Sequence, residues 1–234
     1  VGIPATSLYT LHIQSDPQHL HMASMLLIFS LLICSALSTN PVDRAELVAL
    51  GADLCSSTAI VFSNDSRYAT AKLATIKTVF FAPFAIIYAT CENDVVEFIN
   101  FVNAVEDEVP FRIRSGGHQW GGYSNCDDCI VLDLSHLNST SFDASTGMVT
   151  LGPGVNNGQL VPFLAANDVM LPHGWCPTVC IGGLAQNGGT SFLNRPLGMI
   201  SDYVQSVNIV TADGEKLTCS VDPSVEDQSQ SENG

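Results

Sequence analysis

The amino-acid sequence predicts an α+β fold. In the first half, short apolar runs with the composition of strands alternate with amphipathic helical patterns. The second half contains mostly short strands and turns, without the regular strand–helix alternation of a nucleotide-binding sheet. No linker divides the middle of the 234-residue chain, which is long enough for one core or for two small subdomains that share one.

The first predicted elements are a helix followed by two strands. Asp43 and Glu46 form a capping-box pattern, which predicts a helix through about Cys55. Residues 58–62 are expected to form a short strand, and residues 84–89 a buried one. This part of the chain therefore supplies the first strands of a sheet and a helix to cover it.

Two further helices are expected from apolar residues at helical spacing. Asn93 can cap the first of them, whose apolar face consists of Val95, Phe98, Ile99, Val102 and Val105. The second contains Leu160, Phe163 and Leu164 and ends near Asn167. Pro162 is expected to disturb its first turns, because proline lacks the amide N–H that a helix uses.

The remaining strands are short. Three are expected at residues 111–114, 130–134 and 148–151. Two more, at residues 204–210 and 216–219, flank Asp213-Gly214, which is a strong signal for a hairpin turn.

The two ends of the chain differ from its centre. Residues 26–37 form an apolar run, shorter than the roughly 20 residues that span a membrane. Small residues follow it, so a secretory signal peptide within a leader of residues 1–39 is predicted, with a signal anchor as the alternative. Residues 219–234 are polar and predict a disordered tail.

Charge and glycosylation motifs bear on partners and location. The net charge of −15 argues against nucleic acid and against stable association with anionic membranes. Asn64 and Asn138 each begin an Asn-x-Ser/Thr motif, which fits a secreted glycoprotein. We therefore expect an extracellular protein.

The chain has eight cysteines. Cys34 lies in the leader and would leave with it, so an odd number remains and one thiol is left over in an oxidising compartment. If that thiol is Cys176, the other six can form up to three disulfides, in a pairing that the sequence does not define. A zinc site made of Cys126, Cys129, Cys176 and Cys180 is the alternative.

A first glycine loop, residues 114–124, follows the strand predicted at residues 111–114. Ser115, Gly116, Gly117 and His118 offer successive backbone N–H groups that few side chains shield, an arrangement suited to a pyrophosphate. The loop matches neither the dinucleotide fingerprint nor the Walker motif. Taken alone, the loop can also be a tight turn whose histidine forms ordinary hydrogen bonds within the protein.

A second glycine loop, residues 171–183, places Cys176 between Trp175 and Pro177. A structural disulfide is the simplest interpretation of a single secreted cysteine. Taken together, however, the two loops suggest a large phosphate-bearing cofactor that is tied covalently through His118 and Cys176.

On these motifs, the chain resembles the berberine-bridge-enzyme-like branch of the vanillyl-alcohol oxidase flavoproteins, whose FAD-binding domain is of the PCMH type. Residues 111–124 are similar to the family's pyrophosphate loop, and residues 171–183 to its second flavin loop. Asp202 and residues 207–214 resemble the strand and turn on the adenine side. The resemblance implies an FAD-binding region over residues 40–218, with a PCMH-type core over about 78–218, built from two α/β subdomains and lacking the substrate domain.

The resemblance also implies a set of cofactor contacts. It predicts FAD bonded through His118 to the C8 methyl carbon of the flavin and through Cys176 to C6. The residues expected to contact FAD are Arg114, Ser115, Gly116, Gly117, His118, Gly122, Ser124, Cys176, Gly182, Gly183, Asp202, Val207 and Ile209. Cys180 departs from the family pattern, since glycine usually follows Cys-Pro-x-Val there.

The implied reaction is that of an FAD-dependent oxidase. A small sugar, alcohol or amine gives a hydride to the flavin, which O₂ then reoxidises. The catalytic base remains unknown, because the family carries it on a later segment, and Tyr123 and His173 are more simply packing or loop residues. The alternatives are a truncated or non-catalytic flavin-binding product, and a secreted binding module held together by disulfides or zinc.

Overall fold

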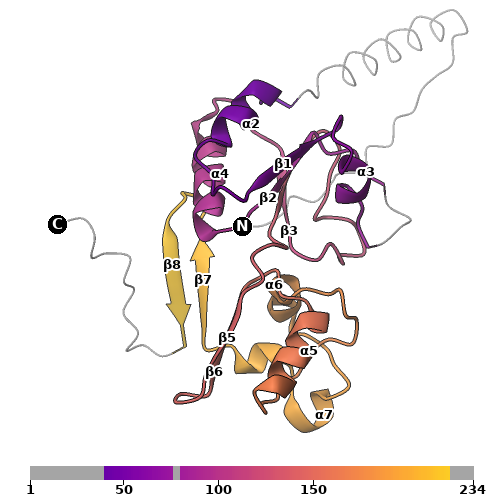
Figure 1. Cartoon of the computed structure of the whole chain (residues 1–234), viewed down its shortest axis with the longest axis vertical. Helices are drawn as coiled ribbons and strands as arrows, with labels where there is room; N and C mark the ends of the chain where they lie inside the picture. The colour runs from indigo at the N-terminus through magenta and orange to yellow at the C-terminus, as the bar shows by residue number, and fades with distance from the viewer. Residues whose placement is uncertain (1–39, 76–79, 222–234) are drawn as a thin grey trace, which may run out of the picture. The chain divides into compact units, whose positions relative to one another are not determined.

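The computed structural model describes residues 40–75 and 80–221, all within the second of the two units into which the chain divides (Figure 1). The predicted signal peptide and most of the predicted polar tail lie outside the described residues. Within them, no helix is both long and apolar enough to cross a membrane.

The first half of the described chain forms a four-stranded sheet in the order β1-β2-β4-β3. Its strands are β1 (Ala59–Phe62), β2 (Ala85–Tyr88), β3 (Phe111–Arg114) and β4 (Ile130–Asp133). β1 is antiparallel to β2, whereas β4 is parallel to both β2 and β3. The sequence prediction placed every one of these strands to within one residue at each end. β1, β2 and β4 are almost entirely apolar, whereas β3 alternates apolar residues with arginine.

Helices cover both faces of this sheet. α2 (Arg44–Leu50) and α4 (Glu92–Ala104) pack with Ile87, Ile130 and Leu132 in one core cluster. Ile86 and Val131 belong to a second cluster with Ala71 of the short helix α3 (Tyr68–Ala71). Neighbouring residues of β2 and β4 enter different clusters because successive side chains of a strand point to opposite faces.

The starts of α2 and α4 test the capping predictions. Asp43 and Glu46 form the predicted capping box, but α2 ends at Leu50, before Cys55, because the chain turns at Gly51. The N-cap of α4 is Cys91 and not Asn93, so that prediction was wrong. Cys91 has the extended backbone of an N-cap and is held there by a disulfide to Cys55.

Asp94 ties the start of α4 to the chain before β1. Its buried carboxylate accepts hydrogen bonds from the backbone N–H groups of Cys55 (2.7 Å), Thr90 (2.7 Å) and Cys91 (3.2 Å), and from the Thr58 hydroxyl. Burial alone would raise the pKa of Asp94, but these hydrogen bonds outweigh it and hold the pKa below its ordinary value.

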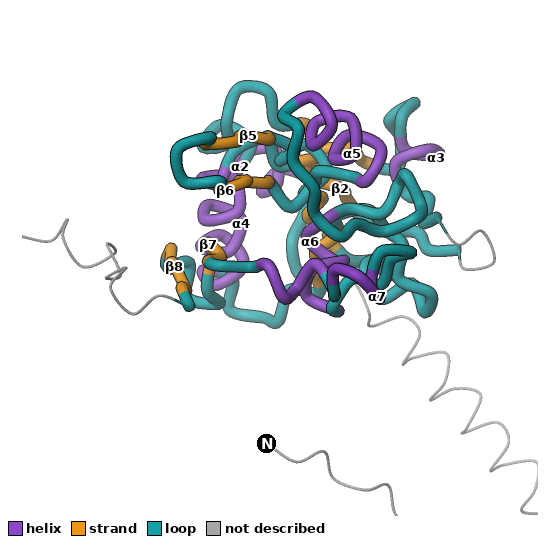
Figure 2. Tube along the Cα trace, turned by 90° about the horizontal axis from the view of Figure 1, so that it is seen from below, coloured by secondary structure: helices purple, strands orange, loops and turns teal. Residues whose placement is uncertain are grey.

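The second half packs around a smaller cluster that contains Val155, Leu160, Leu164, Ile181 and Ile200. The elements are β5 (Thr140–Asp143), β6 (Met148–Leu151), α5 (Asn157–Ala166), α6 (Ile181–Leu184), η1 (Ala185–Asn187), α7 (Asn194–Leu197) and η2 (Ile200–Tyr203). Loops of irregular backbone connect the helices (Figure 2).

Helix α5 differs from the prediction at Pro162, which lies inside the helix without interrupting it. A capping box between Asn156 and Gln159 fixes the first turn, and Leu160 and Leu164 are buried on either side of the proline. The missing N–H of residue 162 removes only its bond to the carbonyl of Gly158. Capping and burial therefore outweigh that loss.

A hairpin of β7 (Ser206–Val210) and β8 (Lys216–Ser220) ends the described chain. Its predicted turn is confirmed, with Gly214 at φ +81°. Asn103 on α4 donates a hydrogen bond of 2.8 Å to the carbonyl of Ala212, which attaches the turn to the first half. β8 continues to Ser220, so residues 219 and 220 belong to the strand and not to the predicted tail.

The described cysteines form two disulfides, Cys55–Cys91 and Cys126–Cys129. The second bond uses two of the four thiols that the zinc alternative needs, so that site is not formed. Cys176, Cys180 and Cys219 are free thiols.

Replacing Asp94 with Asn should destabilise the fold by about 1.5–3 kcal/mol at pH 7, the worth of a hydrogen bond to a charged group. Folding lowers the pKa of Asp94, so the ionised carboxylate stabilises the folded state fully above the unfolded pKa of about 3.9. This stabilisation is lost as the pH falls through the pKa of the folded state. Urea unfolding at pH 7 and pH 3 should show the difference between wild type and Asp94→Asn shrinking at the lower pH.

The exposed Asp213 provides the matched control. Asp213→Asn should leave stability unchanged at both pH values. Equal stability of Asp94→Asn and wild type at pH 7 would contradict the role given to this carboxylate.

Candidate cofactor site

The two glycine loops meet through their backbones. A Cβ atom on Gly116 would lie 3.0 Å from the backbone N of Cys180, from its Sγ and from the carbonyl O of Thr178. Such distances are shorter than ordinary carbon contacts, which begin near 3.5 Å. The loops can touch here only because residue 116 has no side chain.

His118 and Cys176 approach the same hydroxyl group. His118 Nε2 lies 2.8 Å from Thr178 Oγ1, and Cys176 Sγ lies 3.5 Å from that oxygen. The structure therefore brings together the two predicted nucleophiles, 58 positions apart in the sequence, through a threonine that the sequence analysis did not identify.

The electrostatic environment suits both side chains to bond formation. Burial lowers the pKa of His118, so its ring is neutral near pH 7 and keeps one nitrogen lone pair. Hydrogen bonds from the Thr178 side chain, and then from the backbone N–H groups of Thr178 and Val179, lower the pKa of Cys176. A lower thiol pKa increases the fraction of thiolate, which is the nucleophilic form.

Asn157, at the first position of α5, holds the second glycine loop. Its buried side chain donates to the carbonyl of Cys176 (3.0 Å) and accepts from the N–H of Gly174 (3.1 Å). The backbone N–H groups of Asn157 and Gly158 donate to the carbonyls of Val179 and Pro177. The amides at the start of α5 therefore donate to the second glycine loop. In the sequence, Asn156-Asn157 before an apolar segment indicates a helix cap. No sequence pattern indicates that Asn157 also contacts the second glycine loop.

The first glycine loop keeps several amides available. No described residue accepts a hydrogen bond from the N–H groups of Gly116, Gly117 or His118. Gly117 and Gly122 have φ angles of +64° and +72°, which few side-chain-bearing residues adopt. Ser115 anchors the loop by donating to the carbonyl of Pro153 (2.6 Å), and Thr75 donates its N–H to Gly117 (3.2 Å).

The side chain of Arg114 points into the protein and does not run along this loop. Its buried guanidinium bonds through Nε to Asp133 (2.5 Å) and through Nη2 to the carbonyl of Ala71 (2.8 Å). Two buried polar atoms in the described chain have no partner, Arg114 Nη1 and Ser124 Oγ. Both belong to the predicted cofactor contacts, and a buried polar atom left without a partner is costly. These orphaned atoms and the free amides fit an anionic ligand.

Gly182 and Gly183 lie in α6 with different surroundings. Gly182 donates its N–H to the carbonyl of Pro153 (3.0 Å) and leaves no room for a Cβ, which would lie 2.8 Å from the Pro153 side chain. Gly183 has no atom within 4 Å of a Cβ position, so its surface is open.

Asp202, Val207 and Ile209 form no hydrogen bond or ion pair with the two glycine loops among the described residues. Asp202 accepts a hydrogen bond of 2.8 Å from the N–H of Met199 and so caps η2. Val207 and Ile209 lie two positions apart on β7, on the same face, and are 46% and 41% exposed.

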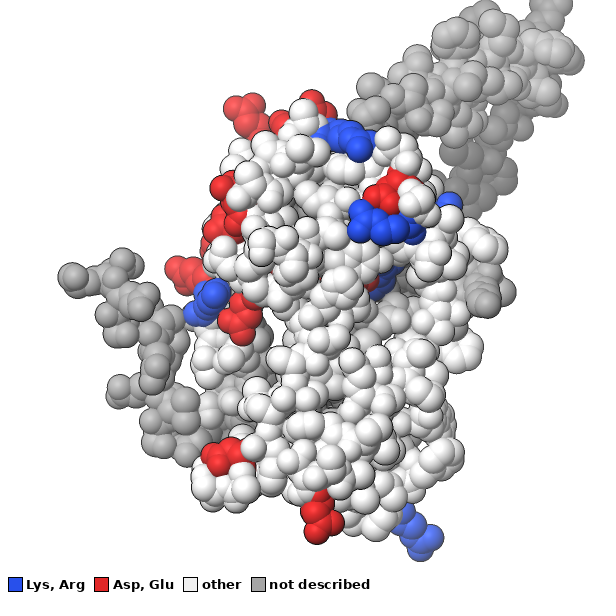
Figure 3. Space-filling view, in the orientation of Figure 1, with Lys and Arg blue, Asp and Glu red and all other residues white. Residues whose placement is uncertain are grey.

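Large aromatic side chains are exposed beside the free thiol. The rings of Trp175 and Phe192 are 5.1 Å apart, and Trp120 and Tyr123 of the first loop are also exposed. The view in Figure 3 shows few charged side chains over α5 and α6, and no cluster of lysines or arginines there.

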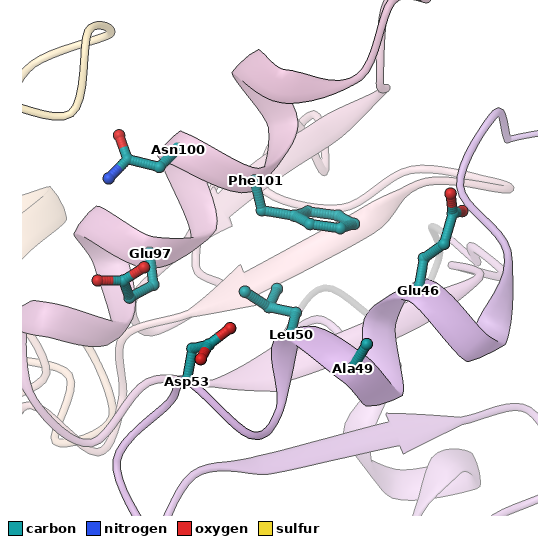
Figure 4. Close-up of a pocket in the computed structure, with 7 residues that line it drawn as sticks. All are labelled: Glu46, Ala49, Leu50, Asp53, Glu97, Asn100 and Phe101. Atoms are coloured by element: carbon teal, nitrogen blue, oxygen red, sulfur yellow. The ribbon is translucent and has the colours of Figure 1, made fainter.

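A groove of about 380 Å³ lies elsewhere, between α2 and α4 (Figure 4). It is lined by Glu46, Ala49, Leu50, Asp53, Glu97, Asn100 and Phe101. It contains none of the predicted site residues, and its three carboxylates would repel a pyrophosphate.

Comparisons with known proteins identify the family of this chain. A family model described as an FAD binding domain matches residues 83–220, more than half of the chain. The chain belongs to this FAD-binding family.

Several relatives extend that result. The chain is 42% identical over 107 residues to the FAD-linked oxidoreductase pynB of Aspergillus niger, covering 46% of this chain and 20% of that protein. The BBE-like 1 protein of Physcomitrella patens is 28% identical with a TM-score of 0.68, over 75% of this chain and 37% of that one. The resemblance to berberine-bridge-enzyme-like flavoproteins and the α+β fold class are thereby confirmed.

A second solved structure shows the same fold. The glucooligosaccharide oxidase of Acremonium strictum, which carries a 6-S-cysteinyl, 8α-N1-histidyl FAD, has a TM-score of 0.67 and 21% identity. The match covers 76% of this chain and 37% of that one. At this identity the likeness establishes the fold alone. In all three comparisons, the chain spans well under half of the relative's length.

Gly116→Ala should lower the free energy of unfolding by about 1–3 kcal/mol, the usual cost of overpacking, because the new methyl group separates the two loops. Gly183→Ala is the matched control. Its Cβ meets nothing within 4 Å, and alanine in a helix is better than glycine by about 0.5–1 kcal/mol, so stability should hold or rise. Thermal unfolding of the flavin-free proteins measures both. Equal effects of the two substitutions would contradict the close contact at Gly116.

Proposed function

We propose that this chain is the flavin-holding part of an FAD-dependent oxidase, with FAD attached through both His118 and Cys176. The observation that carries the proposal is the convergence of His118 Nε2 (2.8 Å) and Cys176 Sγ (3.5 Å) on Thr178 Oγ1. Two nucleophiles joined through one small hydroxyl can reach neighbouring positions on one flat ring system.

The rest of the cradle supports the same cofactor. The unpaired amides of Gly116, Gly117 and His118 can donate to the pyrophosphate, as backbone nests do. Ser124 Oγ and Arg114 Nη1 offer two further donors. Trp175, which directly precedes Cys176, packs its exposed ring against that of Phe192, and the two rings can exclude water from one side of the flavin. Asp202, Val207 and Ile209 remain proposed contacts on the adenine side.

When bound, the flavin would take a hydride from a substrate carbon that carries an alcohol or amine and pass the electrons to O₂. This chain's own residues bind and orient the cofactor. In the described part of the chain, no carboxylate, tyrosine or second histidine forms a hydrogen bond with His118 or Cys176. The proposal therefore gives these residues no role in removing a proton from the substrate.

We assign a small sugar or alcohol as the preferred substrate class, with amines next. We also place the protein outside the cell. The disulfides Cys55–Cys91 and Cys126–Cys129 support an oxidising compartment, since such bonds are rare in the cytosol. The sequon residues Asn64 and Asn138 would then carry glycans.

The second candidate is a flavin-binding protein without turnover. It is favoured by the lack of any base next to His118 and Cys176 among the described side chains. Hydrogen peroxide release from sugars, alcohols or amines would exclude this candidate, whereas bound FAD without peroxide would favour it.

The single substitutions His118→Ala and Cys176→Ala test the attachment. Wild type, produced with FAD, should keep its flavin after denaturation, and each single variant should also keep it through the remaining bond. The double variant should release all of it. In-gel flavin fluorescence and the absorbance spectrum record these states.

Cys219→Ala is the control, because Cys219 is a free, exposed thiol on β8. It should behave as wild type. If Cys176→Ala and Cys219→Ala give identical spectra and masses, Cys176 is not an attachment point.

A further inference from the structure

We infer that Thr178 is a positioning residue that prepares His118 and Cys176 together, by accepting a hydrogen bond from His118 Nε2–H and donating one to Cys176 Sγ. This inference rests on the proposed function, because it concerns the two atoms proposed to bond to FAD. Its tests use flavin-free protein, so they can fail or succeed independently of cofactor binding.

The geometry joins the three groups in a row. Thr178 Oγ1 lies 2.8 Å from His118 Nε2 and 3.5 Å from Cys176 Sγ. A hydroxyl has one hydrogen to donate and accepts through its lone pairs. It can therefore serve both partners only as a directed chain, with one partner donating to it and the other accepting from it.

The two possible directions have opposite chemical results. If Nε2–H donates to Oγ1 and Oγ1–H donates to Sγ, the Nδ1 lone pair of His118 is free and negative charge on Cys176 is stabilised. If Sγ–H donates to Oγ1 and Oγ1–H donates to Nε2, the ring proton sits on Nδ1 and the sulfur stays neutral. Only the first direction leaves both side chains nucleophilic.

The chemistry of the three groups at these distances favours the first direction. A thiol S–H is a weak donor, whereas an imidazole N–H and a hydroxyl O–H are stronger ones, and the first direction uses only the two stronger donors. The hydroxyl hydrogen therefore points to the sulfur, and the lowered pKa of Cys176 agrees with this. His118 then has to supply the hydrogen on its side.

The other titratable groups nearby do not compete for this arrangement. His173 donates from Nδ1 to the carbonyl of Gly174 (3.0 Å), and the buried Cys180 lies with its Sγ 3.9 Å from the carbonyl of Thr178. No described carboxylate, lysine or arginine forms a hydrogen bond or ion pair with His118 or Cys176.

The backbone holds Thr178 in place on both sides. Gly158 donates its N–H to the carbonyl of Pro177 (2.8 Å), and Val179 donates its N–H to the carbonyl of Cys176 (3.2 Å). The carbonyl of Thr178 itself lies against Gly116. The hydroxyl position is therefore set by the contact between the two loops and not by the exposed side chain alone.

The first test uses wild-type protein produced without riboflavin. Nitrogen-15 NMR of the histidine rings reports which nitrogen of His118 carries the proton, with His118→Ala identifying the signal. We expect the Nε2–H form near pH 7. Finding the Nδ1–H form would overturn the inference, whatever the behaviour of any variant.

The second test measures the reaction of Cys176 with iodoacetamide at pH 7, quantified at that residue by mass spectrometry. Thr178→Val keeps the shape but removes the hydroxyl, and should slow alkylation about five- to tenfold, the effect of losing one hydrogen bond of ordinary strength. Thr178→Ser restores the hydroxyl and should return the rate to within about twofold of wild type.

Thr150→Val, on an exposed position of β6, is the matched control and should leave the rate unchanged. An unchanged rate in Thr178→Val, or a rate as slow in Thr178→Ser as in Thr178→Val, would overturn the inference. Should wild type bind no FAD while both flavin-free tests succeed, the proposed function fails and the role of Thr178 stands.

Discussion

The candidate site depends on one close approach of two backbone segments, at Gly116. A side chain there would press on both Cys180 and Thr178 at 3.0 Å, so the loops touch only because residue 116 is glycine. This contact sets the position of Thr178 and thereby the 2.8 Å distance from its hydroxyl to His118. The nucleophile pair is thus a consequence of backbone packing, before any cofactor is considered.

Each loop is fastened to its own half of the fold. The first glycine loop leaves the carboxyl end of β3, where Arg114 and Asp133 form a buried ion pair across the β3–β4 pairing. The second is held at the start of α5 by Asn157, whose side chain bonds to Gly174 and Cys176. Ligands of parallel sheets bind beyond the carboxyl ends of the strands, and this site follows that rule.

Sequence patterns predicted the strands of the first sheet, because three of them, β1, β2 and β4, are short apolar runs and β3 alternates apolar residues with arginine. They missed β5, whose residues alternate in exposure within a polar segment, and the short helices after α5, which have too few residues for a period. The glycine loops were recognisable from motifs. The partners that complete them, Thr178 for His118 and Asn157 for Cys176, lie too far along the chain for any local pattern to reveal.

In the proposed function, one flavin bridges His118 and Cys176. Because no Lys or Arg lies between Arg114 and Arg195, trypsin leaves both residues in one peptide, and cleavage at aspartate is needed to separate them. Mass spectrometry of such a digest of the FAD-loaded chain should show the His118 peptide and the Cys176 peptide joined through a single FAD. Recovery of both peptides unmodified, or of flavin attached to any other residue, would contradict the claim.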